Sequence, residues 1–218
     1  MSVWAVLAAA GRGERLGDDR PKAFARLGDL PLVAEPLRRL EDSEWIDGIV
    51  VAAPPGWEEP CIVLAEELGA GKVSSVVAGG ETRAASVRAA LAEVPDEAAV
   101  VVVHDAARPL VGDDVIGRVL APLSDGFDGA VPVLPLADTV KRIRRDEVVE
   151  TLDRDGLVVS QTPQAFLADA LRRAASGEGT DCASLVEAQG GRIKAVPGDP
   201  RLLKVTSQDD LDLVASWL

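Results

Sequence analysis

The chain has 218 residues, of which 47% are hydrophobic and 27% charged, and its formal net charge is −13 at pH 7. This length suffices for one globular core, so we predict a single domain over residues 1–218. A negative charge of this size repels a phosphate backbone and argues against nucleic acid as a partner. No apolar run is long enough to cross a bilayer, and the start lacks the basic lead of a signal peptide. We therefore predict a cytoplasmic protein that binds no membrane.

Apolar runs alternate with amphipathic segments from the start of the chain to about residue 136. This alternation is typical of an α/β fold, and we predict a three-layer α/β/α, Rossmann-like domain with a mostly parallel mixed sheet. The expected strands are Val3–Ala10, Gly48–Ala53, Lys72–Val77, Ala99–His104 and Gly129–Leu134. The expected helices between them are Leu32–Leu40, Glu58–Leu68, Thr82–Val94 and Asp114–Leu123.

The alternation stops after Leu136. Short β-rich pieces around Arg144–Glu147 indicate a hairpin, and we predict that residues 137–160 form a protruding arm. A two-stranded arm is only marginally stable alone in water, so we expect it to pack against a second copy and form a homodimer. The elements expected after the arm are helices Ala165–Ala175 and Asp181–Ala188, strands Arg192–Val196 and Leu202–Val205, and a last helix from Gln208.

A glycine-rich loop, AAAGRGERLG, directly follows the first predicted strand. Gly11 and Gly13 allow a ligand to approach the backbone closely, and successive N–H groups in such a loop bind anions. Arg15 and Lys22 bracket the loop and suit a triphosphate, whose charge must be neutralised as pyrophosphate leaves. A dinucleotide-binding turn is the alternative, but it requires an acidic residue at the end of the second strand, where this chain has Ala52-Ala53-Pro54.

A second polar segment, HDAARP, ends the strongly apolar strand that contains residues 100–103. Ligands of α/β proteins bind at the carboxyl ends of such strands. Asp105 offers the hard oxygen ligands that Mg²⁺ prefers, and another divalent cation is possible. His104 is the only histidine of the chain, and we expect it to be a buried residue without a catalytic role. The two cysteines, Cys61 and Cys182, are expected to be reduced thiols.

Taken together and in this order, the motifs resemble those of the 2-C-methyl-D-erythritol 4-phosphate cytidylyltransferase family. The resemblance covers essentially the whole chain. The glycine loop, HDAARP and the TPQ of residues 162–164 are its most specific parts. The other matching segments are Pro21-Lys22, Gly79–Arg83 with Ser86, Asp138-Thr139, Asp153-Arg154, Thr180-Asp181 and Lys204–Thr206.

The resemblance implies an enzyme that transfers CMP from CTP to an alditol phosphate and uses magnesium. It also implies that the arm reaches across a homodimer, so that arm residues serve the partner's site. Implied catalytic residues are Arg15, Lys22, Arg154 and Lys204. Implied nucleotide-binding residues are Ala8, Ala9, Ala10, Gly11, Gly13, Gly80, Glu81, Ser86 and Ala106. Implied residues for the second substrate are Asp105, Arg108, Thr139 and Thr180, and Asp105 is also the implied metal ligand.

The sequence departs from the family pattern at Cys182, where relatives often carry an acidic residue. Asp199 lies near a possible second metal ligand, but a turn residue in Gly198-Asp199-Pro200 is the better interpretation. Two alternative functions stay open from the sequence. The acceptor could be another alditol phosphate, such as ribitol 5-phosphate, or the chain could be a nucleotide-binding regulatory module without chemistry.

Overall fold

An eight-stranded mixed sheet lies at the centre of the structure, a computed structural model that describes residues 2–11, 20–177 and 179–218. Its strands are β1 (Val3–Ala8), β4 (Gly48–Ala53), β5 (Val73–Ala78), β6 (Val100–Asp105), β7 (Gly129–Pro135), β10 (Val158–Ser160), β11 (Gln164–Leu167) and β12 (Ile193–Pro197). The order is β10-β7-β11-β6-β1-β4-β5, with β12 paired to β7. The pairs around β1 and β4 are parallel, as is β7 with β12, whereas β10 and β11 are antiparallel to their neighbours.

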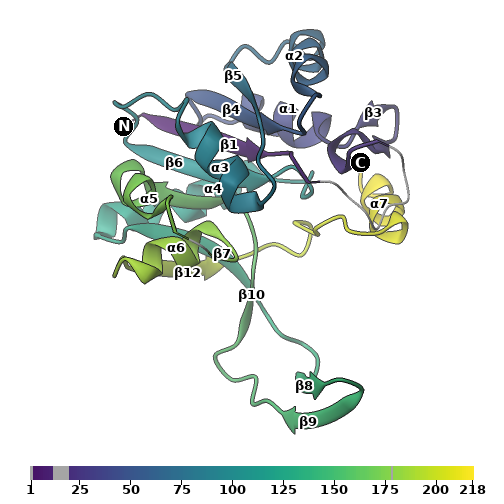
Figure 1. The fold of residues 1–218 in the computed structure, drawn as a ribbon, viewed down its shortest axis with the longest axis vertical. Coiled ribbons are helices and arrows are strands. Elements are labelled where there is room, and N and C mark those ends of the chain that lie inside the picture. The colour runs from purple at the N-terminus through teal and green to yellow at the C-terminus, as the bar shows by residue number, and fades with distance from the viewer. Residues whose placement is uncertain (1, 12–19, 178) are drawn as a thin grey trace.

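Helices cover both faces of this sheet (Figure 1). One face carries α1 (Ala34–Asp42), α2 (Glu58–Glu67) and α4 (Asp113–Leu120), and the other carries α3 (Arg83–Leu91), α5 (Ala168–Ala174) and α6 (Cys182–Ala188). A 3-10 helix, η3 (Ala121–Asp125), continues α4. The predicted three-layer α/β/α architecture with a mostly parallel mixed sheet is therefore confirmed.

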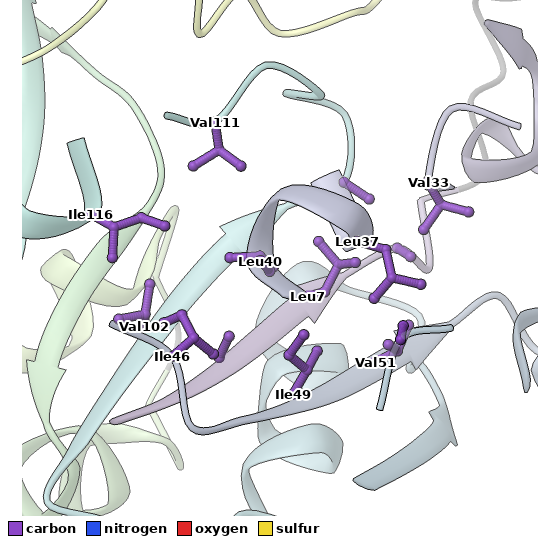
Figure 2. Close-up of a cluster of buried hydrophobic side chains, with 14 of the residues drawn as sticks. Leu7, Val33, Leu37, Leu40, Ile46, Ile49, Val51, Val102, Val111 and Ile116 are labelled. Carbon is purple, nitrogen blue, oxygen red and sulfur yellow. The ribbon is translucent and has the colours of Figure 1, made fainter. Parts of the chain in front are cut away.

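Side chains of each central strand pack alternately against the two helix layers, because successive residues of a strand point to opposite faces of the sheet. Leu7 and Val102 pack in one cluster with Leu37 and Leu40 of α1 (Figure 2), whereas Val103 belongs to the cluster on the other face. Both faces are thus apolar, which explains why β1, β4 and β6 are almost continuous apolar runs in the sequence.

A smaller cluster lies beside the sheet and supports the start of the cavity wall. Leu27, from the hairpin of β2 (Arg26–Leu27) and β3 (Leu30–Pro31), packs there with Leu32, Leu110 and residues of α7 (Gln208–Ala215). The 3-10 helix η2 (Lys22–Phe24) precedes this hairpin and packs in the main cluster instead. Ser207 caps α7 by accepting from the Asp210 amide, and the Asp210 side chain accepts from the Ser207 amide in return. Val205 and Val214 are completely buried in this cluster, so the C-terminal segment is held firmly against the body.

The hairpin arm projects away from the sheet (Figure 1). Its strands are β8 (Lys141–Arg144) and β9 (Glu147–Thr151), and every residue of both is exposed. Ile143 is 67% exposed and Val148 60% exposed, so the arm presents apolar side chains that this chain does not cover. A hairpin within residues 137–160 was predicted from the sequence and is present, whereas its role in dimerisation stays a prediction.

One predicted helix begins three residues later than expected, and one predicted strand does not form. The helix expected over Ala165–Ala175 begins only at Ala168, because residues 164–167 form β11 and pair with both β6 and β7. Phe166 is fully buried there, and tertiary pairing overrides the local helical pattern. The strand expected over Leu202–Val205 does not form; the Val205 amide instead donates a hydrogen bond to the Ala107 carbonyl at 2.8 Å.

No helix among the described residues is both long and apolar enough to span a membrane. Cys61 and Cys182 are buried free thiols, as predicted. Burial, the largest cause, raises the pKa of the Cys61 thiol to about 12, so the thiol stays protonated and unreactive near neutral pH.

Candidate active site

A cavity of about 790 Å³ opens at the carboxyl ends of the parallel strands. Its walls include the residues that follow β1, β4, β5 and β6. The strand β1 pairs with β4 on one side and with β6 on the other, so the strand order reverses here. Open α/β sheets bind ligands at such a reversal point. The position of the cavity therefore makes it the candidate active site.

Most of the predicted site residues within the described part of the chain line this cavity. They are Ala8, Ala9, Ala10, Gly11, Lys22, Gly80, Glu81, Ser86, Asp105, Ala106 and Lys204. Gly13 and Arg15 lie outside the described residues. Arg108, Thr139, Arg154 and Thr180 are described but do not line the cavity. The structure therefore brings together the predicted nucleotide-binding residues more completely than those predicted for the second substrate.

Asp105, at the end of β6, holds two cations at the cavity. Arg83 Nε donates to Oδ1 at 2.8 Å, and Lys204 Nζ donates to Oδ2 at 2.7 Å. The Asp105 side chain is 9% exposed. Its burial favours the neutral acid, but the charges of Arg83 and Lys204 outweigh that effect and hold the pKa of Asp105 below its usual range. Asp105 is therefore an anion at any pH near neutrality.

Positive charge is in excess in the described lining. Its charged side chains are the four cations Arg20, Lys22, Arg83 and Lys204 and the two carboxylates Glu81 and Asp105. The whole chain carries a net charge of −13, so this local excess runs against the average. A concave surface lined by one sign of charge concentrates ligands of the opposite sign. The cavity is suited to an anionic ligand.

Arg83 belongs to the site, although it was not among the predicted site residues. It is the first residue of α3, whose N-terminus is capped by the Thr82 hydroxyl accepting from the Ala85 amide at 3.1 Å. Besides its contact with Asp105, Arg83 Nη1 lies 3.5 Å from Cys182 Sγ. Nη2 is buried and has no hydrogen-bond partner among the described residues. The sequence feature that could have indicated it is its place at the end of the motif Gly79–Arg83, two residues after the predicted Glu81.

The loop that joins β5 to α3 packs tightly against the loop after β1. A Cβ on Gly79 would overlap the side chain of Ala10, and a Cβ on Gly80 would collide with Ala85. The buried Ser86 hydroxyl donates to the Thr82 carbonyl at 2.9 Å and accepts from the Gly80 amide at 3.1 Å. Glycine is thus required here by close approach of the backbone, which fixes the shape of this cavity wall.

Gly11 differs from these two glycines. A Cβ on Gly11 would meet nothing within 4 Å, so the packing of the described residues does not require glycine at this position. The space beside it belongs to the cavity. A ligand that approaches the backbone closely is a physical reason for glycine there.

His104 is completely buried at the end of β6. Its Nε2 lies 2.9 Å from the Arg108 carbonyl oxygen, and its Nδ1 lies 3.2 Å from Thr162 Oγ1. Burial, the largest cause, lowers the pKa of His104 to about 4, so the imidazole is neutral near pH 7. The interpretation of His104 as a buried residue is confirmed.

Arg108 and the segment before α7 are tied together. Arg108 Nη1 donates to the Leu202 carbonyl at 2.6 Å, and Nε is buried without a partner among the described residues. Asp199 accepts from the Arg201 amide at 2.7 Å through Oδ1, which is the behaviour of a turn residue. Leu202 and Arg108 thereby hold the segment that places Lys204 beside Asp105.

A model of the family described as 2-C-methyl-D-erythritol 4-phosphate cytidylyltransferase matches residues 3–218. The chain belongs to this family. A protein of this name from Frankia casuarinae is 46% identical over 99% of this chain and 81% of the relative. Another, from Saccharopolyspora erythraea, is 43% identical over the full length of both chains.

Solved structures of the family have the same fold. A crystal structure of a 4-diphosphocytidyl-2C-methyl-D-erythritol synthase covers 99% of this chain and 97% of its own, with a TM-score of 0.84 and 31% identity. The 2-C-methyl-D-erythritol 4-phosphate cytidylyltransferase of Thermus thermophilus covers 97% of this chain and 96% of its own, with a TM-score of 0.80 and 32% identity.

Membership of the cytidylyltransferase family confirms the resemblance found in the sequence. The chain is accordingly an enzyme, a CTP-dependent nucleotidyltransferase, and the regulatory module without chemistry is not supported.

Proposed function

We propose that the chain transfers CMP from CTP to 2-C-methyl-D-erythritol 4-phosphate, forming 4-diphosphocytidyl-2-C-methyl-D-erythritol and pyrophosphate. The observation that carries the proposal is the cation-lined cavity at the reversal of strand order, built from the segments that match the family. CTP and the sugar-alcohol phosphate are both anions, which agrees with the local excess of positive charge.

The nucleotide is expected to lie along the loops after β1 and β5. The space beside Gly11 would admit a phosphate close to the backbone, while Ala8–Ala10 and Ala106 form the adjacent wall. Gly80, Glu81 and Ser86 would surround the cytosine and ribose, because they form the tightly packed wall at the other end. Gly13, in the same loop as Gly11, would complete the phosphate cradle.

The cations would neutralise the triphosphate. Lys22 and Lys204 reach the cavity from opposite ends of the sequence, and Arg15 would join them. A pre-arranged set of cations stabilises the charge that develops as the leaving group departs. The second substrate's phosphate oxygen would form a bond to the α-phosphorus, and the bond from that phosphorus to the β-phosphate oxygen would break, releasing pyrophosphate.

No general base is required for this step. The second pKa of a phosphate monoester is about 6, so its oxygen is already a nucleophile near neutral pH. The protein's contribution is to hold both substrates in line and to neutralise charge, as is general in phosphoryl transfer.

A divalent cation, and specifically Mg²⁺, fits the donor set. Among the described residues no group of three or more His, Cys, Asp or Glu side chains could hold a metal, and Asp105 is the buried carboxylate of the cavity. Mg²⁺ typically takes one or two carboxylates together with substrate phosphates and waters. Arg83 and Lys204 each take one oxygen of Asp105, and the remaining lone pairs of this carboxylate would hold the ion. The ion would supply charge stabilisation for the leaving group.

Arg108, Thr139, Arg154 and Thr180 would serve the second substrate, although none of the four lines the cavity wall. Arg154 donates through Nη1 to the Ala137 carbonyl, so both lie at the base of the exposed arm. An arm with uncovered apolar side chains gains stability by packing on another copy. We therefore propose a homodimer in which Thr139 and Arg154 complete the partner's site.

Pyrophosphate release with CTP and each of several alditol phosphates, with and without Mg²⁺, tests the reaction. We expect turnover with 2-C-methyl-D-erythritol 4-phosphate and none without a divalent cation. Faster turnover with ribitol 5-phosphate would identify the other acceptor as the substrate. CTP binding without turnover on any acceptor would overturn the proposal.

Mixing two inactive variants tests the shared site. Arg154→Ala would remove a residue given to the partner, and Lys22→Ala would remove one from the chain's own cavity. After the subunits exchange, a hybrid dimer would have one intact site and regain activity. Each variant re-equilibrated alone is the control. No recovery in a mixture shown to exchange subunits would refute the shared site.

We also propose a cytoplasmic location. Cys61 and Cys182 are free thiols, and a reducing compartment keeps thiols in this state. Fractionation of the source cells would check it.

A further inference from the structure

The imidazole of His104 connects the two ends of the turn that carries Asp105 and Arg108. At one end its Nε2 contacts the Arg108 carbonyl oxygen at 2.9 Å. At the other end its Nδ1 contacts Thr162 Oγ1 at 3.2 Å, and the same oxygen accepts the Asp105 amide at 3.0 Å. One ring therefore bridges the residue at the end of β6 and the residue three positions later.

The chemistry of the partners fixes which nitrogen carries the proton. A backbone carbonyl can only accept, so Nε2 must be the donor to Arg108. The neutral ring then has an acceptor at Nδ1, and the Thr162 hydroxyl must donate to it. That hydroxyl still has lone pairs for the Asp105 amide. Every donor and acceptor of the group is satisfied, and each hydrogen bond allows only one direction.

Both ends of this bridge lead to residues of the proposed reaction. The Asp105 carboxylate holds Arg83 and Lys204 at the cavity. Arg108 holds the Leu202 carbonyl at 2.6 Å, and the Val205 amide bonds to the Ala107 carbonyl inside the bridged turn at 2.8 Å. The position of the turn thus sets where Asp105 and Lys204 stand relative to each other.

We propose that His104, through Thr162, is a positioning residue for CMP transfer: as the Nε2–H tautomer it holds the turn at residues 105–108 so that Asp105 and Lys204 face the cavity together. The proposal rests on the proposed function above. His104 touches neither substrate and does not transfer a proton. Removing a hydrogen-bond partner that orients a ligand-holding group typically lowers activity by about 10-fold to 100-fold.

Histidine-specific ¹⁵N NMR of the wild-type enzyme tests the tautomer directly. His104 is the only histidine in the chain, so the imidazole spectrum has one residue in it. We expect a protonated Nε2 and an unprotonated Nδ1, with the Nδ1 signal moving in Thr162→Val, which lacks the hydroxyl donor. A protonated Nδ1 at neutral pH would overturn the proposal. This measurement needs no substrate, so it stands even if the proposed reaction fails.

Steady-state kinetics with CTP and 2-C-methyl-D-erythritol 4-phosphate test the positioning role. His104→Phe keeps a ring but removes both hydrogen bonds, and we expect kcat to fall about 10-fold to 100-fold. His104→Gln keeps an amide N–H that can reach the Arg108 carbonyl, so we expect it to recover part of the loss. Thr162→Ser, which keeps the hydroxyl, should stay close to wild type, whereas Thr162→Val should lose activity.

A matched control separates positioning from general stability. Ser43 is a buried polar residue at the end of α1, and its hydroxyl donates to Asp113, the first residue of α4. Neither residue lines the cavity. Ser43→Ala should lower the melting temperature without changing kcat below it. Unchanged kcat in folded His104→Phe or in Thr162→Val would overturn the proposal. If His104→Phe does not fold, the comparison of Thr162→Ser with Thr162→Val and the ¹⁵N spectrum of wild-type His104 test the proposal instead. A wild-type enzyme without turnover would instead refute the proposed function.

Discussion

Acidification is expected to destabilise the folded enzyme through the single histidine. His104 is fully buried, and burial lowers its pKa from the ordinary 6.5 to about 4. Because its pKa is higher in the unfolded chain, the unfolded state binds the proton first as the pH falls. The stabilisation from neutral His104 is therefore fully present above the unfolded pKa of 6.5, and it is lost as the pH falls through 4.

The size of the effect follows from the difference between the pKa of His104 in the folded and in the unfolded chain. A tenfold change in the proton affinity of a group corresponds to about 1.4 kcal/mol. The fall of the pKa from 6.5 to about 4 therefore amounts to about 3 kcal/mol in total. Integrating the proton uptake down to about pH 5 gives a loss of about 2 kcal/mol. That is a substantial part of the roughly 5–15 kcal/mol by which such domains are stable.

The pH window distinguishes His104 from the carboxylates. The pKa of Asp105 is also held below its usual range, so its contribution has the same sign. Its loss, however, begins only when the unfolded carboxyl takes up a proton, near a pKa of about 3.9. Between about pH 6.5 and pH 5, the pH dependence of stability should therefore come chiefly from His104.

Urea unfolding from about pH 7.5 to about pH 5, extrapolated linearly to water, measures this loss. His104→Gln is the control, since its side chain does not titrate. We expect the variant to be less stable at neutral pH but to lose much less stability on acidification. If wild type and variant lost the same free energy over this range, the buried neutral histidine would not be the cause.

Four further outcomes are expected. Arg15→Ala should lower kcat by about 10²–10³, the scale of a lost transition-state donor, and a variant with normal turnover would remove Arg15 from that role. Asp105→Asn should lower the free energy of unfolding in urea by about 1.5–3 kcal/mol, since two charge-assisted hydrogen bonds weaken. Arg83→Ala should lower kcat by about 10-fold to 100-fold, with Arg83→Lys recovering part of it because lysine can still pair with Asp105. Leu171→Ala, in the core, should cost about 2–5 kcal/mol in unfolding while kcat of the folded enzyme stays unchanged.

The central strands could be predicted because a strand that is buried on both faces needs apolar residues at nearly every position, which gives a continuous apolar run in the sequence. The predicted bounds Gly48–Ala53 coincide with β4. The strand β11 could not be found in this way. It has four residues and is followed by a helix without an intervening turn, so its apolar residues also fit a helical period. Only its pairing with β6 and β7 makes it a strand.

The candidate site was predictable where its residues lie in continuous motifs. The loop after β1 and the segment His104–Pro109 are of this kind, and both contribute residues to the cavity. Arg83 shows the limit of that reasoning. Its role depends on contacts with Asp105 and Cys182, which are 22 and 99 residues away in the chain. The local sequence around Arg83 does not show which distant residues contact it in the folded chain. A cation at the start of a helix is ordinarily a solvated surface charge.

Asp105 also explains how the cavity can hold several cations close together. The side chain of Asp105 is 9% exposed, whereas Arg83 is 25% and Lys204 is 42% exposed. The carboxylate therefore lies beneath the two cations, and a ligand entering the cavity meets positive charge first. Each cation has donors that Asp105 does not use, since lysine has three and arginine five. A phosphate can bind these donors while Asp105 keeps its hold, so little reorganisation is needed when charge develops in the transition state.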